Sequence, residues 1–371
     1  MPERVLLQDA DPPEDDFACA VFLFRHTSRL GGTWRGDVCH WVMAFVLALE
    51  KRRSDRMTVY KERCSSVADI FREALSLVKR DCACYPGNKV FYCFRGESHN
   101  YSHPGSEDVD EGPVLPSIYR GDKLIEHESD ILNEALRTFP EYFKDDKTTF
   151  EILSRMRHYG YATRLLDVTP KLTTALAMAL ARFDEKKDWI DLPGFIHVYR
   201  IHIDKVKYST GDTVTALCNL ARIKSEHVKM DDLEYLAYEC RNERAGFFWK
   251  KKGDRINDIH DVSAKLDRDI GKVWYVKPVV NSPRINSQRG EFFLFGCGEN
   301  KKMLDATFSE EDFNNDNAAT DGISHIATLT LLQEAKKEAR EMELYLDISE
   351  DRIYPDFHHH NQVLTERYEN G

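Results

Sequence analysis

The sequence predicts an α+β fold in which helices surround a set of short strands joined by loops. Residues 88–97 (NKVFYCFRGE) and 194–203 (GFIHVYRIHI) are short apolar runs with alternating side chains, a pattern typical of strands. Between them, residues 158–179 (HYGYATRLLDVTPKLTTALAMA) change hydrophobic period abruptly. No segment repeats at a fixed period, and none is of low complexity. Together these observations favour helices gathered around a mixed or antiparallel sheet.

The segment 158–179 reads as a strand, a tight polar turn and a buried helix. Residues 161–168 are rich in apolar and β-branched side chains, and the residues from 172 onward place leucines and alanines on one helix face. Thr169 is expected to cap the helix, with Pro170 at its first position. Asp167 and Thr169 thus lie where a strand ends and a helix begins, a place that suits anionic ligands and catalytic loops. Simple capping explains both residues equally well.

Further elements follow from the same periodicities. Residues 17–24, 273–280 and 288–295 are expected to be strands. Helices are expected over 67–79, 131–139, 150–157, 172–183 and 327–346. We expect residues 1–56 to be an N-terminal extension and residues 57–371 to be the main domain, with its C-terminal helix and tail.

Composition and charge describe an ordinary soluble globular protein. Of 371 residues, 42% are hydrophobic and 31% charged, and 52 Lys and Arg against 63 Asp and Glu give a net charge of −11. This charge argues against general attraction to nucleic acid, although a local basic groove stays open. No apolar run is long enough to span a bilayer, and the amino terminus is acidic, unlike a signal peptide. We expect a cytoplasmic protein with no membrane partner.

Neither a disulfide framework nor a metal site is expected. The nine cysteines are odd in number and scattered, which favours reduced core thiols. Cys82 and Cys84 with His99 and His103 suggest zinc, but their spacing matches no common zinc motif. Residues 358–360 are three consecutive histidines, which point in alternating directions on an extended segment and therefore fit a loop better than a metal site.

One stretch interleaves aromatic and basic residues. Between Arg244 and Arg255, Phe247, Phe248 and Trp249 stand directly before Lys250, Lys251 and Lys252. Such a patch suits stacking on bases and neutralising phosphates of single-stranded nucleic acid. A core strand that ends in solvated lysines explains the same pattern. Phe248, Trp249, Lys250 and Lys251 are the candidate substrate-binding residues.

Five ordered segments resemble the FRG domain, a family named for its Phe-Arg-Gly signature. They are FYCFRGES, the run LPSIYR at 115–120, HYGYATRLLDVT, QRGEFFLFG and IYPDFHHHNQ. The resemblance extends over about residues 57–368. The family name by itself implies no particular activity.

The chain also resembles the ADP-ribosyltransferases of the Arg-Ser-Glu type. In those enzymes a strand ends in aromatic-Arg-Gly, a later strand ends in Ser-Thr-Ser before a helix, and another strand is opened by Glu-x-Glu. This chain has Phe94-Arg95-Gly96, then residues 167–169 (DVT) before a helix, then residues 288–292 (QRGEF). The resemblance implies an ADP-ribosyltransferase-like split sheet and NAD as the substrate.

The same resemblance suggests roles for individual residues. Cleavage of the nicotinamide–ribose bond develops positive charge on the ribose, so an acceptor or anionic group is needed beside it. Gln288 or Glu291, with Thr169, would supply that catalytic group. The cofactor-binding residues would be Arg95, Gly96, His158 and Asp167, with the arginine fork and the missing glycine side chain suited to a pyrophosphate. Gln-x-Gly replaces Glu-x-Glu, and Asp-Val-Thr replaces Ser-Thr-Ser.

These observations lead to an expected function. We expect an NAD-dependent ADP-ribosyltransferase, a toxin-like or phage-defence effector that modifies RNA, single-stranded DNA or a protein, with NAD as substrate and no metal. Such an effector leaves room for an antitoxin or inhibitor protein as a partner. The alternative is a catalytically inactive module that binds a nucleotide or a partner. A nuclease ranks last because the sequence lacks clustered acidic metal ligands.

Two spatial expectations follow. Arg95, Asp167, Thr169 and Gln288 or Glu291 should converge on one pocket, because each lies at a strand end or in the turn leaving it. Arg164, three residues before Asp167, should point to the opposite face and pair with a carboxylate elsewhere.

Overall fold

The computed structural model describes residues 60–83, 89–100, 114–120, 123–181, 191–240, 248–251, 254–256, 259–303 and 322–355. The chain divides into two units, Met1–Met57 and Thr58–Gly371, and every described residue belongs to the second. The expectations for residues 1–56, His103, Arg244, Phe247, Lys252 and residues 358–360 lie outside this part of the chain.

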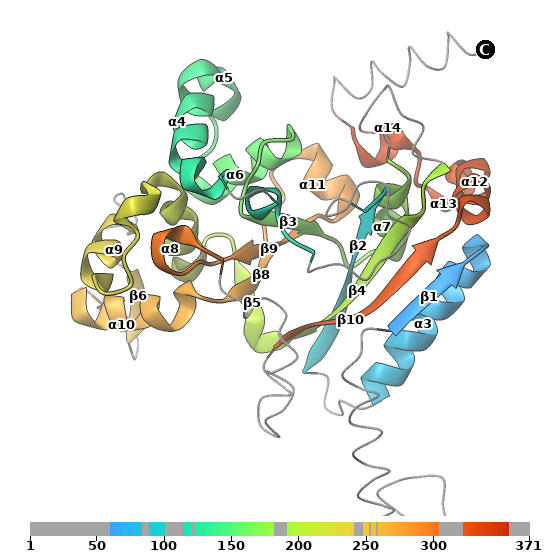
Figure 1. Cartoon of the computed structure of the whole chain (residues 1–371), viewed down its shortest axis with the longest axis horizontal. Helices are drawn as coiled ribbons and strands as arrows, with labels where there is room; N and C mark the ends of the chain where they lie inside the picture. Colours follow the sequence, from blue (N-terminus) through green and yellow to red (C-terminus); the bar gives the residue numbers. More distant parts are fainter. Residues whose placement is uncertain are drawn as a thin grey trace, which may run out of the picture. The chain divides into compact units, whose positions relative to one another are not determined.

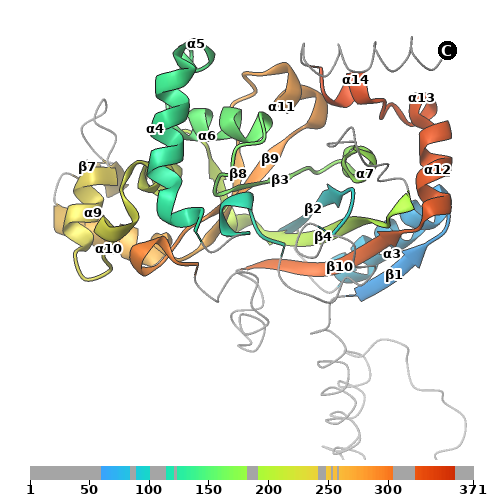
Figure 2. The ribbon, with the colours of Figure 1, turned by 45° about the horizontal axis from the view of Figure 1, so that its top comes forward.

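Two four-stranded sheets form the centre of the second unit (Figures 1 and 2). The first has the order β1 (Tyr60–Cys64), β10 (Ile323–Leu331), β4 (Gly194–His202), β2 (Val90–Glu97). The second has the order β3 (Leu165–Val168), β9 (Glu291–Phe295), β8 (Val273–Lys277), β5 (Val206–Tyr208). The pairs β1–β10 and β5–β8 are parallel and the others antiparallel, so the predicted α+β class with mixed sheets is confirmed.

An isolated backbone bridge joins the two sheets at β2 and β3. Phe94 and Thr169 pair in antiparallel fashion: the Phe94 N–H donates to the Thr169 carbonyl at 2.7 Å, and the Thr169 N–H donates to the Phe94 carbonyl at 2.8 Å. This pair of hydrogen bonds brings the end of β3 beside the middle of β2. Strand order therefore continues from one sheet to the other at this point.

Helices cover the outer faces, and apolar side chains fill three cores. The helices α3 (Val67–Ala83), α7 (Leu172–Leu180) and α12 (Gln333–Glu341) share one core with the first sheet. A second core lies under α4 (Glu128–Thr138), α6 (Thr149–His158), α8 (Asp212–Asn219), α9 (Leu233–Cys240) and α10 (Ile259–Ile270), against the second sheet. The third core lies between the sheets and includes Cys93, Val168, Tyr199 and Phe293.

Shorter elements complete the described part. They are the helices α5 (Pro140–Phe143), α11 (Pro283–Gln288), α13 (Glu343–Leu346) and α14 (Glu350–Ile353), the hairpin β6 (Phe248–Lys251) and β7 (Asp254–Ile256), and the 3-10 turns η1 (Ser117–Tyr119), η2 (Ile125–His127), η4 (Ile203–Lys205), η5 (Leu220–Arg222), η6 (Ser225–His227) and η7 (Glu299–Lys301). None of the described helices is long and apolar enough to cross a membrane.

Three expectations about elements were wrong in whole or in part. Of the helix expected over 327–346, residues 333–341 and 343–346 are helical, as α12 and α13, whereas residues 327–331 belong to β10. The alternating β-branched residues of 323–331 pair with strands on both sides. The strand expected from 288 begins at Glu291, because Ser282 caps α11 and Arg289 ends it with a positive φ of 44°. Helix α7 begins at Leu172, ends at Leu180 and has Lys171 at its N-cap position, so Thr169 is not its cap.

The described cysteines carry free thiols, as expected, and five of these six are buried. Within the described ranges, no group of three or more His, Cys, Asp or Glu residues is arranged to hold a metal ion.

Arg164 lies in a buried ionic cluster, which confirms that it pairs with a carboxylate elsewhere in the chain. Its guanidinium donates from Nε to Glu128 Oε1 at 2.7 Å and from Nη2 to Glu128 Oε2. The Lys301 ammonium donates to the same carboxylate at 2.9 Å. Although burial raises it, the charges of Arg164 and Lys301 hold the pKa of Glu128 down at about 2. The cluster ties α4 and η7 to the start of β3.

We predict that Glu128→Gln lowers the free energy of unfolding at pH 7 by about 3–5 kcal/mol, because two buried cations lose their counter-ion. The depressed pKa gives the carboxylate a stabilising contribution that is present above about pH 4.5 and is lost as the pH falls toward 2. Urea unfolding measures the change. Glu134→Gln, which removes an exposed partner of Arg137 on the same helix, is the control and should change stability by less than about 1 kcal/mol. Equal effects of the two variants would contradict a buried ionic cluster.

Gly96 lets β2 approach α7 closely. A Cβ atom at this position would lie 1.8 Å from the Ala175 carbonyl oxygen and 2.7 Å from the Ala179 backbone nitrogen. Both contacts are to helix backbone, which cannot rotate away. The glycine of the Phe-Arg-Gly signature is therefore required by the packing of α7 on β2.

We expect Gly96→Ala to destabilise the protein by about 3 kcal/mol or more, since the added methyl group forces α7 away from β2. Gly290→Ala is the matched control, because the nearest atom to its added Cβ lies at 3.7 Å. Urea midpoints of the two variants give the comparison. An unchanged midpoint for Gly96→Ala would show that the helix is free to shift.

Candidate functional site

Arg95 lies near the C-terminal end of β2, and its guanidinium connects three segments. Nε and Nη2 contact Glu97 Oε1 at 3.0 and 2.9 Å, and Nη1 donates to the Asp167 backbone carbonyl at 2.9 Å. The side chain is 4% exposed. Burial lowers the pKa of Arg95, but the carboxylates of Glu97 and Asp167 raise it by more, so the net change is a rise. These contacts account for three of its five N–H groups.

Asp167 belongs to β3 and pairs with Arg157 at the end of α6. The Arg157 Nε donates to Asp167 Oδ2 at 2.8 Å, and Arg95 Nη1 lies 4.0 Å from the same oxygen. Although burial raises it, the charges of Arg157 and Arg95 hold the pKa of Asp167 down at about 2. Asp167 is therefore an ionised carboxylate held between two arginines.

Thr169 and Gln288 contact each other where β3 meets α11. The Thr169 hydroxyl donates to the Gln288 backbone carbonyl at 2.9 Å and accepts from the Lys171 N–H at 3.1 Å. The Gln288 side-chain amide donates to the Ile353 carbonyl at 3.1 Å. Both residues are buried. Their polar groups thus hold α7, α11 and α14 together.

Glu291 opens β9 and differs from every other carboxylate of the site. Its Oε2 atom is buried and has no hydrogen-bond partner among the described residues. Burial raises its pKa to about 7. An unpaired carboxylate of this kind is costly to the fold, and such groups gather at functional sites.

Strand register places Arg95 and Glu291 on the same face. Glu291 pairs with Val168, and Val168 belongs to the core between the sheets. Cys93, two positions before Arg95 and hence on its face, belongs to the same core, and burial and the Glu291 charge raise its pKa. Asp167 alternates with Val168 and therefore points to the other face, where Arg157 lies.

The predicted site residues thus adjoin one another but do not all face one pocket. Arg95 and Glu291 lie on the side of the third core, between the sheets. Asp167 faces α6, together with His158, whose ring lies 6.4 Å from that of Phe292. The expected opening beside Gly96 is filled by the backbone of α7, so this glycine offers no space to a pyrophosphate.

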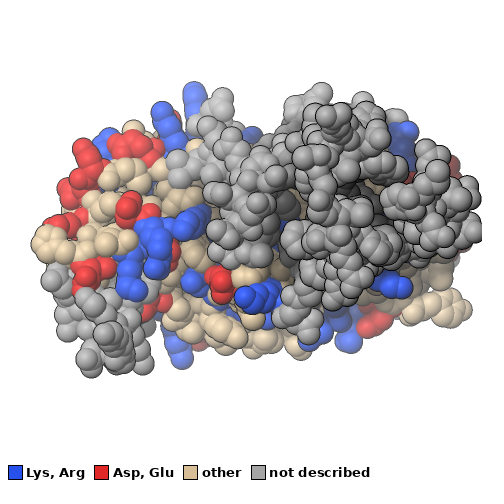
Figure 3. Space-filling model, turned by 90° about the horizontal axis from the view of Figure 1, so that it is seen from below, with Lys and Arg blue, Asp and Glu red and all other residues tan. Residues whose placement is uncertain are grey.

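The predicted substrate-binding residues Phe248, Trp249, Lys250 and Lys251 form β6, which belongs to a separate two-stranded sheet with β7. Their side chains lie outside the described part. On the face drawn in Figure 3, basic and acidic side chains are interspersed over the described surface.

The model of the FRG domain matches residues 92–188. The resemblance to this family is thereby confirmed over that stretch, which runs from β2 through α7. No curated protein and no solved structure matches the chain.

The FRG stretch contributes Arg95, Asp167 and Thr169, whereas Gln288 and Glu291 come from outside it. The arginine and the glycine of its signature have different roles. The Arg95 side chain links β2 to β3 through the Asp167 carbonyl, and Gly96 lets α7 pack closely on β2.

Three residues beside Arg95 or its partner Glu97 were not predicted from the sequence. Glu97 accepts from Arg95 and lies 3.7 Å from Arg120 and 3.5 Å from His197. Burial raises the pKa of Glu97, but Arg95 and His197 outweigh burial and the pKa is strongly lowered. Glu97 stands two positions after Arg95 on one strand, so strand alternation offered a signal for it. Arg120 and His197 gave no such signal, because only the tertiary fold brings them near.

We predict that Glu291→Gln stabilises the protein at pH 8 by about 1–2 kcal/mol, since it removes a partly buried, unpaired charge. The folded-state pKa lies above the ordinary value of 4.5, so the carboxylate costs little stability below about pH 4.5. Its cost grows as the pH rises toward 7. Urea unfolding of both proteins at pH 5 and pH 8 tests this. A variant that is less stable than the original protein at pH 8 would show that Glu291 has a stabilising partner.

Proposed function

We propose that this protein transfers ADP-ribose from NAD, and that Arg95 and Glu291 form the centre of the NAD site. The observation that carries the proposal is the adjacency of three strands. The segments that resemble the transferases lie on β2, β3 and β9, which are neighbours in space although their residues lie far apart in the sequence. One dinucleotide can be held by three segments only if they adjoin. This adjacency supports a split sheet of the ADP-ribosyltransferase type.

Glu291 is the proposed catalytic carboxylate. When the nicotinamide–ribose bond breaks, positive charge develops on the ribose, and an ionised carboxylate beside it lowers the barrier. The Oε2 atom of Glu291 has no hydrogen-bond partner among the described residues, so it can accept a hydrogen bond from a ribose hydroxyl. Gln288 is less suited, because its amide already donates to Ile353 and it lies at the end of a helix.

Arg95 is the proposed contact to the pyrophosphate. Three of its five N–H groups contact Glu97 and Asp167, which leaves two N–H groups for a ligand. The planar guanidinium matches the spacing of phosphate oxygens. Thr169 and Asp167 support this arrangement indirectly, since Thr169 joins β3 to β2 and the Asp167 carbonyl orients Arg95.

The acceptor in this proposal is RNA, single-stranded DNA or a protein, as for a toxin-like or phage-defence effector. The basic and aromatic residues of β6 favour nucleic acid. Label from NAD separates these acceptors, because it appears on nucleic acid in one case and on protein in the other.

A catalytically inactive binding module is the competing function. Two observations favour it: Gln288 replaces the first glutamate of Glu-x-Glu, and its side chain is engaged by α14. Such a module would bind NAD or a partner and release no nicotinamide.

We predict that Glu291→Gln lowers the rate of nicotinamide release from NAD by at least about 100-fold, because the group facing the ribose loses its charge. In the original protein the rate should rise between about pH 6 and 8, as the Glu291 carboxyl ionises near pH 7. Glu341→Gln on α12 is the matched control and should keep the original rate.

Retained activity in Glu291→Gln would contradict the catalytic role of this residue. NAD binding without nicotinamide release by the original protein would favour the binding module. Each assay should be run with and without cellular RNA. An acceptor increases the rate of nicotinamide release by a transferase, whereas a binding module releases no nicotinamide in either case.

A further inference from the structure

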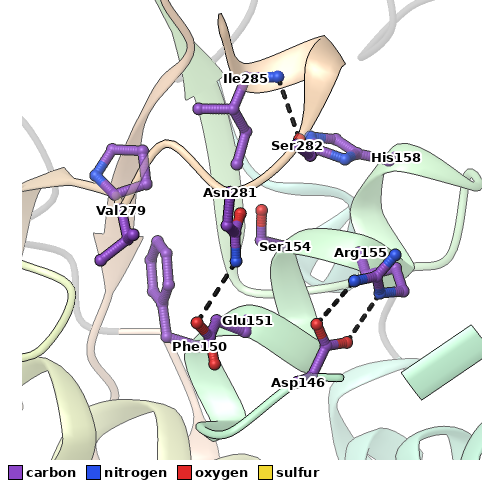
Figure 4. A pocket seen from close by; sticks show the side chains of 11 residues that line it. Asp146, Phe150, Glu151, Ser154, Arg155, His158, Val279, Asn281, Ser282 and Ile285 are labelled. Carbon is purple, nitrogen blue, oxygen red and sulfur yellow. Dashed lines mark hydrogen bonds and ion pairs between the residues drawn. The ribbon is translucent and has the colours of Figure 1, made fainter. Parts of the chain in front are cut away.

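A pocket lies between α6 and the segment that leads from β8 into α11, on the side of the second sheet away from Glu291. Phe150, Ser154 and His158 line it from one face of α6. Val279, Asn281 and Ile285 line it from the opposite wall (Figure 4). The space between these walls is open to solvent, and it measures about 340 Å³ only when the solvent at its mouth is counted. None of these residues was assigned to the NAD site except His158.

Ser154 is the group in this pocket that points to a ligand. The residue is 3% exposed, and its hydroxyl makes no hydrogen bond to any part of the chain that the structure describes. Figure 4 shows the hydroxyl directed from α6 toward the segment around Asn281. A buried hydroxyl without a partner costs free energy, which a bound ligand would recover.

The charged side chains that line the pocket are engaged in contacts within the protein. Arg155 pairs with Asp146 through two contacts of 2.7 and 2.8 Å. Glu151 accepts from the Thr148 N–H at 3.0 Å and from Asn281 at 3.3 Å. Burial and the nearby Arg284 charge lower the pKa of His158 to about 4, so its ring is neutral at physiological pH. Among the described residues that line the pocket, Arg155 is thus a paired cation, and the Glu151 carboxylate disfavours an anionic ligand.

The walls favour a flat apolar ring. The apolar lining comes from Val279, which is 49% exposed, and from the largely buried Phe150 and Ile285, while Ser154 and His158 carry the polar groups. Ser154 and His158 are four residues apart on α6, so both address the same part of the pocket. Few polar groups among apolar walls are typical of a site for a small ring-bearing molecule.

We propose that this pocket binds an uncharged nitrogen heterocycle, either as a free base or as the base of a nucleotide, with the Ser154 hydroxyl as its hydrogen-bond partner. The proposal is independent of NAD cleavage at Glu291. It assigns His158 to a second site on the opposite face of β3 and β9.

Titration calorimetry with matched probes tests the proposal on the full chain. Nicotinamide and nicotinate differ in charge on the same ring, and nicotinamide should bind at least about tenfold more tightly, since a carboxylate finds no free cation. Adenine and AMP separate the two sources of the base. Binding of both assigns the pocket to a nucleotide, whereas binding of adenine alone assigns it to a free base.

Variants then locate the binding. Ser154→Ala should weaken nicotinamide binding about fivefold, the loss expected for one hydrogen bond. Ser263→Ala on α10 is the matched control and should bind as the original protein does. A fold check by circular dichroism accompanies each variant.

The proposal is overturned if neither nicotinamide nor adenine binds, or if nicotinate binds as tightly as nicotinamide. Unchanged affinity in a folded Ser154→Ala variant would likewise exclude Ser154 as the partner. A Ser154→Leu variant that fills the pocket and keeps its fold must abolish binding.

Discussion

The backbone bridge between Phe94 and Thr169 is the constraint on which the rest of the described structure depends. It makes β2 the neighbour of β3 and so joins two sheets that each pack helices against one core and share a third core between them. The side chains around it reinforce the junction: Arg95 holds the Asp167 carbonyl, and Thr169 holds the Gln288 carbonyl. At the same place Gly96 lets the backbone of α7 pack closely on β2. The arginine and glycine of the Phe-Arg-Gly signature therefore have structural roles in this fold. These contacts fix the positions of the side chains in any ligand site at this junction.

Three partly or fully buried carboxylates near the junction show how structural and functional groups differ. Glu128 and Asp167 are paired with cations, which lower their pKa values to about 2. Glu291 has no such partner, and burial raises its pKa to about 7. The first two contribute to the fold, whereas the third costs the fold stability. A cost that neighbouring residues leave uncompensated favours a role in function. This contrast between paired and unpaired carboxylates, more than the resemblance in sequence, is our reason for proposing Glu291 as the catalytic carboxylate.

The sequence predicted much of the fold and less of the site. Alternating apolar residues identified β2 and β4, and helical periodicity identified α3 and α6, because local pattern decides such elements. Sequence pattern failed at β10, because its alternating β-branched residues stand directly before the helical pattern of α12, and the whole stretch was expected to be one helix. Arg164 was predicted as structural from its spacing to Asp167 alone. The division of Asp167 and Glu291 between two faces depends on register between strands, which no local pattern contains.

A structure of the complex with a non-cleavable NAD analogue tests the central claim most directly. The account predicts that the nicotinamide ribose lies within hydrogen-bond distance of the Glu291 carboxylate, with the pyrophosphate at the Arg95 guanidinium. A dinucleotide bound on the face of Asp167 and His158, with Glu291 remote from the ribose, would contradict it.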